Sequence, residues 1–336
     1  MPEAPRKADP DLGRTAVEFL YQSMQIDDQW SVRTESGFEW WGWKLRQRVW
    51  ADQPIEGSDP PITKISLQTD VLRSVPDNDK TYSFLSLLNG IASVNAFVYD
   101  PVEERISLRS TAYVHEQNWS WLQRFLASVC AIQAADAHAR GTAILDMVDA
   151  TLDESAHPSS GERDLKDDML NVLHVYAEEG KAASPFASED LESLGRIQPA
   201  PWLEANMEGA DLTAEFPFSG ELAAVEAIAL EQPLQSSLLR VTGSVRNPQL
   251  GFGAGLRMEL PVQLEGLDGA RRANELNLAE FAGVTFCPLT GAWSGPKCTF
   301  ESFLPAGMFQ RGLLAALIFY QVARAQWVRR EFGAVG

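Results

Sequence analysis

Residues 81–132 read TYSFLSLLNGIASVNAFVYDPVEERISLRSTAYVHEQNWSWLQRFLASVCAI and contain three patterns in a row. Thr81–Ala92 carries apolar side chains at helical spacing, which predicts a helix. Val94–Asp100 and Arg105–Val114 alternate like strands and are joined by a short turn, which predicts a β-hairpin. From Asn118 onward an apolar stripe predicts a long helix. The stretch is therefore expected to form a helix, a hairpin and a second, longer helix.

The segments before this stretch predict a helix followed by strands. Asp11–Met24 has the apolar spacing of a short amphipathic helix. Trp30–Trp50 is rich in tryptophan and alternates like β-structure. Ile62–Val71 places Ile65, Leu67 and Val71 on one face of a strand. The first part of the chain is thus expected to be a helix and a meander of strands.

The second half of the chain repeats this order. The expected strands are Leu212–Phe218, Ala223–Leu230, Ser237–Arg246 and Leu256–Leu264, followed by a helix at Asp268–Ala282, a hairpin at Val284–Leu289 and Cys298–Leu304, and a closing helix at Met308–Phe332. One constant offset, without a gap, places Leu88 on Leu278 and Trp119 on Phe309. Whole supersecondary units at one spacing indicate an internal duplication.

We therefore predict an α+β fold of two similar domains, each an antiparallel sheet with helices on one face. The expected first domain spans 1–150 and the second spans 201–336. Residues 151–200 are expected to be an acidic linker that contains one helix, at Asp164–Glu179. In this arrangement the uncovered face of each sheet is free to bind a partner.

The order of these elements resembles that of the type III secretion chaperone-like superfamily, which includes YbjN-type domains. The resemblance covers each half of the chain and rests on topology, with no sequence motif. It implies small acidic α+β domains that pair through sheet or helix surfaces and hold partner proteins, and it carries over no catalytic residues. Here two such units are fused, which would make a pseudo-dimer in one polypeptide, and an acidic insert spans residues 151–235.

Charge and composition favour a cytoplasmic globular protein. The 336 residues carry a net charge of −18, divided as −7 over residues 1–150, −14 over 151–235 and +3 over 236–336. An acidic protein is repelled by nucleic acid and by anionic membranes, so neither is an expected direct partner. No apolar run approaches the roughly 20 residues of a transmembrane helix, and the N-terminus is unlike a signal peptide.

Motifs for catalysis or cofactor binding are not found in the sequence. The four histidines have no metal-ligand spacing, and no GK[ST] or GxSxG motif occurs. Gly251–Gly255 is glycine-rich, but a strand-like run follows it, so we predict a flexible hairpin loop. Cys287 and Cys298 are expected on the two arms of one hairpin, reduced and buried. We predict no catalytic residue, no metal and no cofactor.

The segment Phe38–Trp50, FEWWGWKLRQRVW, is the candidate binding surface. If it were one strand, one face would present Trp41, Trp43, Leu45 and Val49 to the core, and the other would combine aromatic and cationic side chains. The predicted partner-binding residues on that second face are Trp40, Lys44, Arg46, Arg48 and Trp50. Aromatic and arginine side chains are enriched at protein interfaces. The alternative is internal packing of the tryptophans under the arginines.

We expect a non-enzymatic, chaperone- or adaptor-like protein that binds another protein as a monomeric pseudo-dimer or as a homodimer. The alternative is an acidic regulator or nucleic-acid mimic, whose segment 151–235 would occupy a basic site on a DNA-binding protein. An enzyme with an unrecognised site is the third possibility. Steep weakening of binding with salt would separate the second class from the first.

Overall fold

The computed structural model describes residues 12–91, 94–179, 185–195, 204–209, 211–217, 236–261, 266–285, 287–295 and 298–332. The chain divides into two compact units, one of Met1–Val75 with Arg105–Val172 and one of Pro76–Glu104 with Leu173–Gly336. Each unit combines helices with antiparallel strands. The predicted α+β class, with two similar sheet-and-helix domains, is therefore confirmed.

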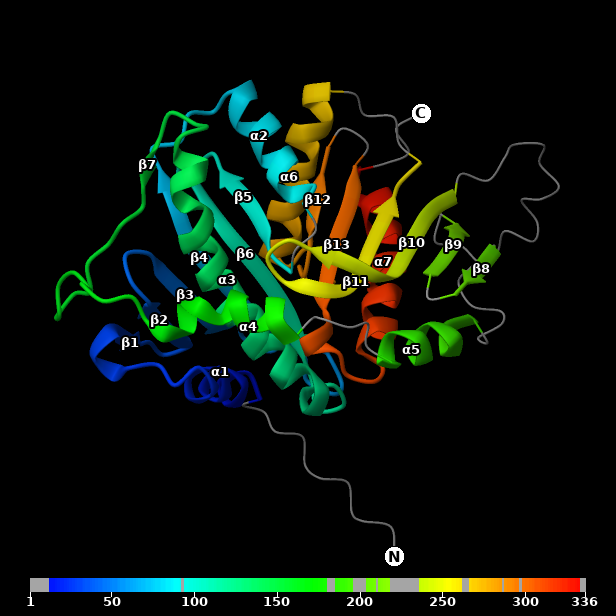
Figure 1. Cartoon of the computed structure of the whole chain (residues 1–336), viewed down its shortest axis with the longest axis horizontal. Coiled ribbons are helices and arrows are strands. Elements are labelled where there is room, and N and C mark those ends of the chain that lie inside the picture. The colour runs from blue at the N-terminus through cyan, green and yellow to red at the C-terminus, as the bar shows by residue number, and fades with distance from the viewer. Residues whose placement is uncertain are drawn as a thin grey trace, which may run out of the picture. The chain divides into compact units, whose positions relative to one another are not determined.

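The first unit is an antiparallel sheet with two main helices (Figure 1). Its elements are α1 (Leu12–Ser23), β1 (Ser31–Arg33), β2 (Gly37–Trp41), β3 (Arg46–Ala51), β4 (Thr63–Arg73), β6 (Arg105–Val114), α3 (Trp119–Leu145), β7 (Thr151–Leu152) and the 3₁₀ turn η2 (Asp168–Asn171). The strands pair in the order β1-β2-β3-β4-β6, and β7 pairs with the end of β4.

Helices α1 and α3 cover one face of this sheet. The register places Gln47 opposite Thr69 and Val49 opposite Leu67 on the helix-facing side. Gln133 of α3 is fully buried there, and its amide bonds the Thr69 hydroxyl and the Gln47 side chain. A buried amide needs such partners, so this polar contact fixes α3 on the sheet.

The second unit contains the elements α2 (Asp79–Asn89), β5 (Ala96–Asp100), α4 (Val172–Glu179), α5 (Pro185–Gly195), β8 (Glu204–Glu208), β9 (Asp211–Pro217), β10 (Ser236–Asn247), β11 (Gly251–Glu259), α6 (Gly266–Ala282), β12 (Ala292–Ser294), β13 (Thr299–Pro305), the 3₁₀ turn η5 (Ala306–Met308) and α7 (Leu313–Phe332). Its strands β8 to β13 form a sheet of order β12-β13-β11-β10-β9-β8. Helix α7 packs on β13, where the Arg324 guanidinium lies 3.6 Å from the Phe300 ring centre.

The two series follow the same order along the chain. In the part of the chain that the structure describes, four strands, a helix, a short strand, a longer strand and a closing helix run from β1 to α3 and again from β8 to α7. The pairing rule is shared too, because the fourth strand of each series pairs with the strand that precedes the closing helix. The two series are therefore similar in the order and pairing of their described elements.

Equivalent asparagines hold the helix and short strand of each series together. Asn89 of α2 exchanges two hydrogen bonds with the main chain of Phe97 in β5, at 2.8 Å each. Asn277 of α6 exchanges two with the main chain of Trp293 in β12, at 3.1 and 2.9 Å. Both asparagines are buried. A side-chain amide here provides one donor and one acceptor to an edge of main chain.

A second set of hydrogen bonds joins the α2–β5 pair to the α6–β12 pair, inside the second unit. Ser86 of α2 bonds the main-chain nitrogen and oxygen of Gly295, at 2.8 and 3.2 Å. Asn274 of α6 bonds the main-chain nitrogen and oxygen of Tyr99 in β5, at 2.9 and 2.8 Å. Ser86 and Asn274 are separated in sequence by the same interval as Asn89 and Asn277. Such exchanged contacts are typical of a two-fold relation.

The predicted ungapped offset, which places Leu88 on Leu278, is therefore wrong in register. When Asn89 is aligned with Asn277, because both bond the main chain of a short strand, Leu88 falls on Leu276 instead. The short strands follow a longer offset, because Phe97 takes the position that Trp293 has in the second series. The two copies consequently differ in the length of the connection between helix and short strand.

The altered register moves the first arm of the second hairpin. That arm is Ala292–Ser294 and not Val284–Leu289, as the sequence predicts. Cys287 precedes the arm, so it is not on a hairpin arm facing Cys298. Both cysteines are free and buried.

The glycine-rich segment is a strand and not a flexible loop. Gly251–Gly255 opens β11, and the turn before it is held by the Asn247 side chain, which accepts from the nitrogens of Gln249 and Leu250. A Cβ on Gly253 would lie 2.2 Å from the Leu304 carbonyl oxygen. Glycine is therefore required by the close approach of β13.

The segment expected as a linker is largely built into the units. Of the expected helix Asp164–Glu179, only η2 and α4 are helical, and Leu165, expected to face inward, is 80% exposed. Ile91, expected on the inner face of its helix, is 46% exposed. The expected strand Ala223–Leu230 lies outside the described residues. Pro76–Glu104 belongs to the second compact unit, whereas the sequence places it in the first domain.

Candidate functional site

The tryptophan-rich segment forms strands, and its part Phe38–Trp50 is divided between two of them. β2 and β3 make a hairpin in which Trp41 pairs with Arg46 and Phe38 pairs with Val49. The turn begins at Gly42, where a Cβ would come 3.0 Å from the Trp40 ring. The faces assigned on the condition that Phe38–Trp50 is one strand therefore do not apply, because the chain reverses between Trp41 and Arg46.

The hairpin separates the five predicted partner-binding residues. Trp40 faces the helices and is 1% exposed, so it belongs to the core. Arg46, Arg48 and Trp50 lie on the opposite face, because alternate strand residues point the same way. Lys44 lies in the turn. The prediction that Trp40 shares a face with the arginines is therefore wrong.

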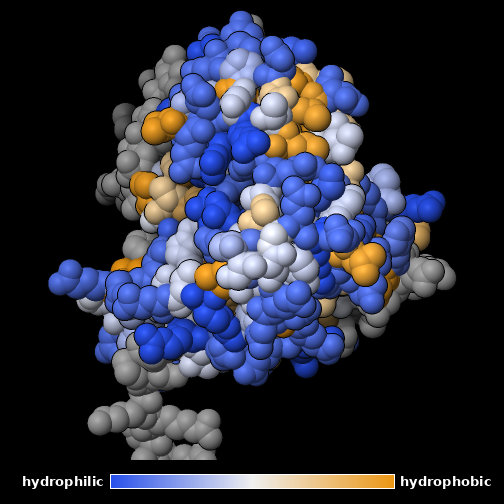
Figure 2. Space-filling view, turned by 90° about the vertical axis from the view of Figure 1, so that its left-hand side faces the viewer, coloured by the Kyte–Doolittle hydropathy of each residue, from blue (hydrophilic) through white to orange (hydrophobic). Residues whose placement is uncertain are grey.

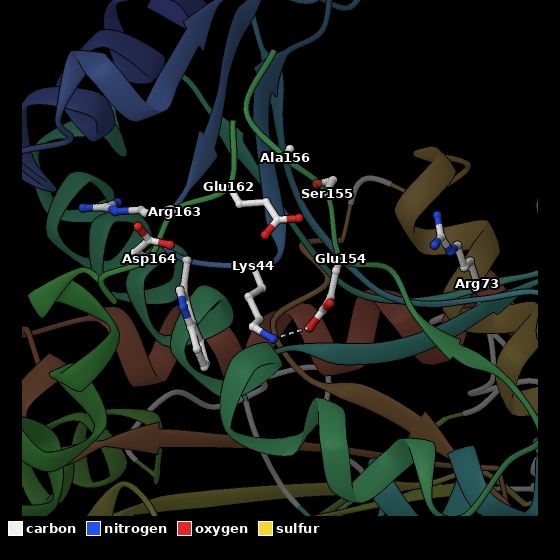
Figure 3. Close-up of a pocket in the computed structure, with 9 residues that line it drawn as sticks. Lys44, Arg73, Glu154, Ser155, Ala156, Glu162, Arg163 and Asp164 are labelled. Atoms are coloured by element: carbon white, nitrogen blue, oxygen red, sulfur yellow. Dashed lines mark hydrogen bonds and ion pairs between the residues drawn. The ribbon is translucent and has the colours of Figure 1, made fainter. Parts of the chain in front are cut away.

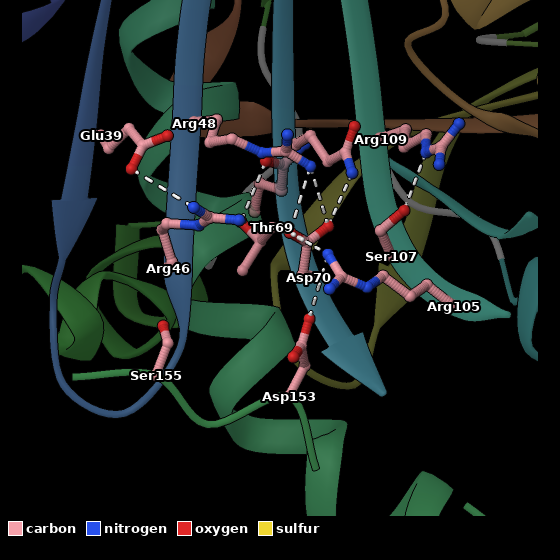
Figure 4. Close-up of polar contacts among 12 residues, drawn as sticks. Glu39, Arg46, Arg48, Thr69, Asp70, Arg105, Ser107, Arg109, Asp153 and Ser155 are labelled. Atoms are coloured by element: carbon pink, nitrogen blue, oxygen red, sulfur yellow. Dashed lines mark hydrogen bonds and ion pairs between the residues drawn. The ribbon is translucent and has the colours of Figure 1, made fainter. Parts of the chain in front are cut away.

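Three arginines converge on one buried carboxylate on that opposite face (Figure 4). Asp70 of β4 is 2% exposed, and its oxygens lie 3.1 Å from Arg48, 3.4 Å from Arg46 and 3.7 Å from Arg105. Gln68 adds a hydrogen bond of 2.6 Å to Asp70. Strand pairing brings these side chains from β3, β4 and β6 to one place. The arrangement neutralises a carboxylate that would otherwise be costly to bury.

Two further acids extend this cluster. Glu39 of β2 pairs with Arg46 at 3.4 Å, and Asp153 lies 3.7 Å from Arg105. Burial raises the pKa of the Asp153 carboxyl, and the charge of Arg105 opposes that shift. The arginines predicted to contact a partner are thus engaged with acids of their own unit.

The segment after β7 folds back onto the β2–β3 turn. The Ser155 nitrogen donates to the Lys44 carbonyl, and the Asp167 nitrogen donates to the Gly42 carbonyl, at 2.9 and 2.8 Å. Trp41 Nε1 donates to the Ser155 hydroxyl at 3.0 Å. These bonds join parts of the chain that are distant in sequence and create a surface that neither segment has alone.

A cavity of about 390 Å³ lies where the turn and this segment meet (Figure 3). It is lined by Trp43, Lys44, Arg73, Glu154, Ser155, Ala156, Glu162, Arg163 and Asp164. The lining is charged, with one large aromatic side chain. Typical small-molecule sites are mainly apolar and enclose their ligand, so this cavity differs from them.

The charges of the cavity are engaged to different degrees. Lys44 Nζ lies 2.8 Å from Glu154, and both side chains are about half exposed, at 48% and 44%. Arg163 is held more firmly, by Asp167 at 3.0 Å and by the Trp41 carbonyl at 2.8 Å. Within the described residues, Glu162 makes no hydrogen bond or ion pair.

Trp43 connects the cavity to a partly buried histidine. Its ring stacks on His138 at 6.2 Å and 25°, and Lys44 Nζ lies 5.2 Å from its ring centre. His138 Nε2 accepts from the Leu45 nitrogen at 3.2 Å, and Nδ1 faces the Ala134 carbonyl at 2.8 Å. Burial lowers the pKa of His138 to about 4. The neutral ring therefore acts as a fixed support for the turn.

The second unit has a buried ion pair of its own. Arg324 of α7 bonds Glu280 of α6 at 2.6 Å, and Trp293 Nε1 donates to the same carboxylate at 2.8 Å. Both charged side chains are at most 1% exposed. Burial raises the pKa of Glu280 against the effect of Arg324. The pair joins two helices and shows no access to solvent.

Surface hydrophobic residues are dispersed. On the face shown in Figure 2 they form separate patches between hydrophilic residues. The most exposed large apolar side chains of the described residues are Val102, Leu165, Leu87, Val284 and Val175. Among the described residues, no helix is long and apolar enough to cross a membrane, and no group of three His, Cys, Asp or Glu is placed to hold a metal ion.

The sequence missed most of this site. Lys44 was predicted to contact a partner and does line the cavity, but Trp43 was expected in the core. The cavity residues from Glu154 to Asp164 were placed in a linker, and only the alternating acids and bases at Glu162–Asp164 distinguish that stretch. Comparison of the chain with protein-family models, with curated proteins and with solved structures finds no match.

Proposed function

We propose that this chain is a non-enzymatic, cytoplasmic protein that binds another protein, as an adaptor or chaperone does. The two similar halves would act together as a pseudo-dimer, a proposal supported by the exchanged contacts of Ser86 with Gly295 and of Asn274 with Tyr99. The centre of the proposed binding surface is the cavity beside Trp43.

The observation that carries the proposal is the lining of this cavity. A half-buried tryptophan is surrounded by charges of both signs, and its Lys44–Glu154 ion pair is half exposed. Aromatic and charged groups around an open hollow suit a protein segment, which offers apolar contacts together with hydrogen-bonding main chain. Exposed ion pairs contribute little stability, so a partner can rearrange them at small cost.

Affinity capture with two matched aromatic variants tests the proposal. Trp43→Ala should lose the proteins captured by the wild-type chain, because it removes the aromatic wall of the cavity. Phe319→Ala removes an exposed aromatic side chain of α7 in the second unit and should retain them. Circular dichroism would establish that both variants are folded. Equal capture by folded Trp43→Ala and wild type would contradict the proposal.

A second candidate function is the acidic regulator that occupies a basic site on a DNA-binding protein. It is favoured by the exposed acids of β8 and β9, where Glu204, Glu208, Asp211 and Glu215 all face solvent. Binding through these residues would weaken steeply as salt rises. Binding through the Trp43 cavity retains an apolar contribution and would weaken less. Substitution of Glu204 and Glu208 would weaken binding through the acids of β8 and β9 and would leave binding through the Trp43 cavity unchanged.

A further inference from the structure

Lys44 lies between an aromatic ring and a carboxylate in the cavity. Its ammonium group is 5.2 Å from the centre of the Trp43 ring and 2.8 Å from Glu154 (Figure 3). An ammonium ion within about 6 Å of an indole ring is attracted by the π electrons, and a carboxylate adds a charge-assisted hydrogen bond. The cavity therefore contains a subsite for a cation, filled by a side chain of the protein itself.

This internal occupant is weakly held. Both partners of the Lys44–Glu154 pair are about half exposed, and exposed pairs of this kind contribute little stability. Lysine also has a flexible stem that can move into solvent. When it does so, Trp43 and Glu154 become available to another cation.

The other charges of the cavity favour a cationic ligand over an anionic one. Glu162 and Asp164 are exposed and make no ion pair within the described residues. Of the three cations, Arg163 is engaged by Asp167 and the Trp41 carbonyl, and Arg73 lies away from Lys44 in Figure 3. The net charge of −18 adds a long-range attraction for a basic partner.

We propose that this subsite receives a basic side chain, and arginine in preference to lysine, from a protein partner that displaces Lys44. Arginine is preferred because its planar guanidinium stacks on an indole ring and binds a carboxylate through two parallel hydrogen bonds. The inference rests on the proposed protein-binding function for the source of the side chain, and it adds the chemistry that is recognised.

Fluorescence anisotropy of labelled hexa-arginine, measured with the full chain at about 20 mM salt, tests the subsite. Lys44→Gln should tighten binding about threefold to tenfold, because it removes the internal competitor and its positive charge. The matched control Lys80→Gln makes the same change in net charge on α2 in the second unit and should tighten binding less than twofold. Hexa-lysine should bind more weakly than hexa-arginine, and hexaglutamate should not bind.

Removing acids should have the opposite effect. Glu162→Gln with Asp164→Asn should weaken hexa-arginine binding about fivefold or more, whereas Glu204→Gln with Glu208→Gln, on exposed β8, should weaken it less than twofold. Equal losses in the two acid pairs, or weaker binding by Lys44→Gln, would overturn the subsite.

The two proposals fail separately. A chain that captures a protein partner through Trp43, but whose peptide binding is indifferent to Lys44, retains its proposed function and loses the basic subsite. A chain whose peptide binding responds as expected, but that captures no protein, keeps the cation subsite and loses the proposed source of its occupant.

Discussion

Asp70 is the residue on which the polar face of the first sheet depends. Arg46, Arg48 and Arg105 all approach its carboxylate, which is 2% exposed. The three guanidinium groups would repel one another if this negative charge were removed. Breaking a buried ion pair by removing one partner is strongly destabilising, because the remaining charge stays desolvated.

Asp70→Asn should therefore lower the free energy of unfolding by about 2–4 kcal/mol, measured by urea denaturation. The asparagine keeps the shape of the side chain, so the loss reports charge. Glu18→Gln is the control, since the Glu18–Arg33 pair is about half exposed and should contribute less than about 1 kcal/mol. Similar losses in the two variants would show that the Asp70 cluster is no stronger than a surface pair.

His138 should make stability depend on pH in a defined range. Burial lowers its folded-state pKa to about 4, and an unfolded histidine titrates near 6.5. Above pH 6.5 the ring is neutral in both states. Between pH 6.5 and 4 only the unfolded state takes up the proton, so the free energy of unfolding falls as pH falls, by at most about 3 kcal/mol.

Denaturation of His138→Gln over this pH range checks the histidine contribution. The glutamine side chain can still accept from the Leu45 nitrogen but does not titrate, so the variant should lose less stability than wild type between pH 6.5 and 4. His174 is exposed on α4, and His174→Gln should follow the wild-type profile. Parallel profiles for wild type and His138→Gln would contradict the assignment.

At the scale of elements, Asn89 and Asn277 should contribute equally to the free energy of unfolding. Asn89→Ala and Asn277→Ala each remove two hydrogen bonds to the main chain of a short buried strand. Each should lower the free energy of unfolding by about 2–3 kcal/mol. Asn206→Ala, on exposed β8, should cost less than about 0.5 kcal/mol. A large loss in only one of the two capping variants would contradict their equivalence.

Elements with long, regular periodicity were predictable from the sequence. Elements whose structure depends on one residue were not. The apolar stripes predicted α1, α2, α3 and α7 to within a few residues. The chain reverses between Trp41 and Arg46 within the tryptophan-rich segment, and Gly253 permits a strand where a loop was expected. Asn89, a residue usually found in turns, faces inward on α2 because it bonds β5. The strand at Gly253 depends on Leu304, a neighbour distant in sequence.

The candidate site was even less predictable for the same reason. Lys44 could be proposed from local composition alone. Its pairing with Glu154, and the cavity that the two residues share, depend on a segment that docks through Ser155 and Asp167. No local periodicity encodes such docking, since the segment is an irregular loop that is fixed by main-chain hydrogen bonds.

At the scale of the whole molecule, the compact units do not follow the repeats. The segment Pro76–Glu104, which holds α2 and β5 of the first series, is part of the same compact unit as α6 and β12 of the second. Cutting the chain at residue 150 would therefore separate Asn274 from the β5 main chain that it bonds. Two similar sheet-and-helix domains could be predicted from the sequence, but the way that the two series share elements between the compact units could not.

Because the two series lie in one polypeptide, a substitution acts on them differently than on the subunits of a homodimer. In a homodimer every substitution occurs twice, so a charged hollow acquired on one subunit is acquired on both. Here the two series are separate stretches of one chain, and they differ in their buried charges: the first has the Asp70 cluster, and the second has the Glu280–Arg324 pair. A substitution at either set of charges is therefore made once per molecule and leaves the other set unaltered.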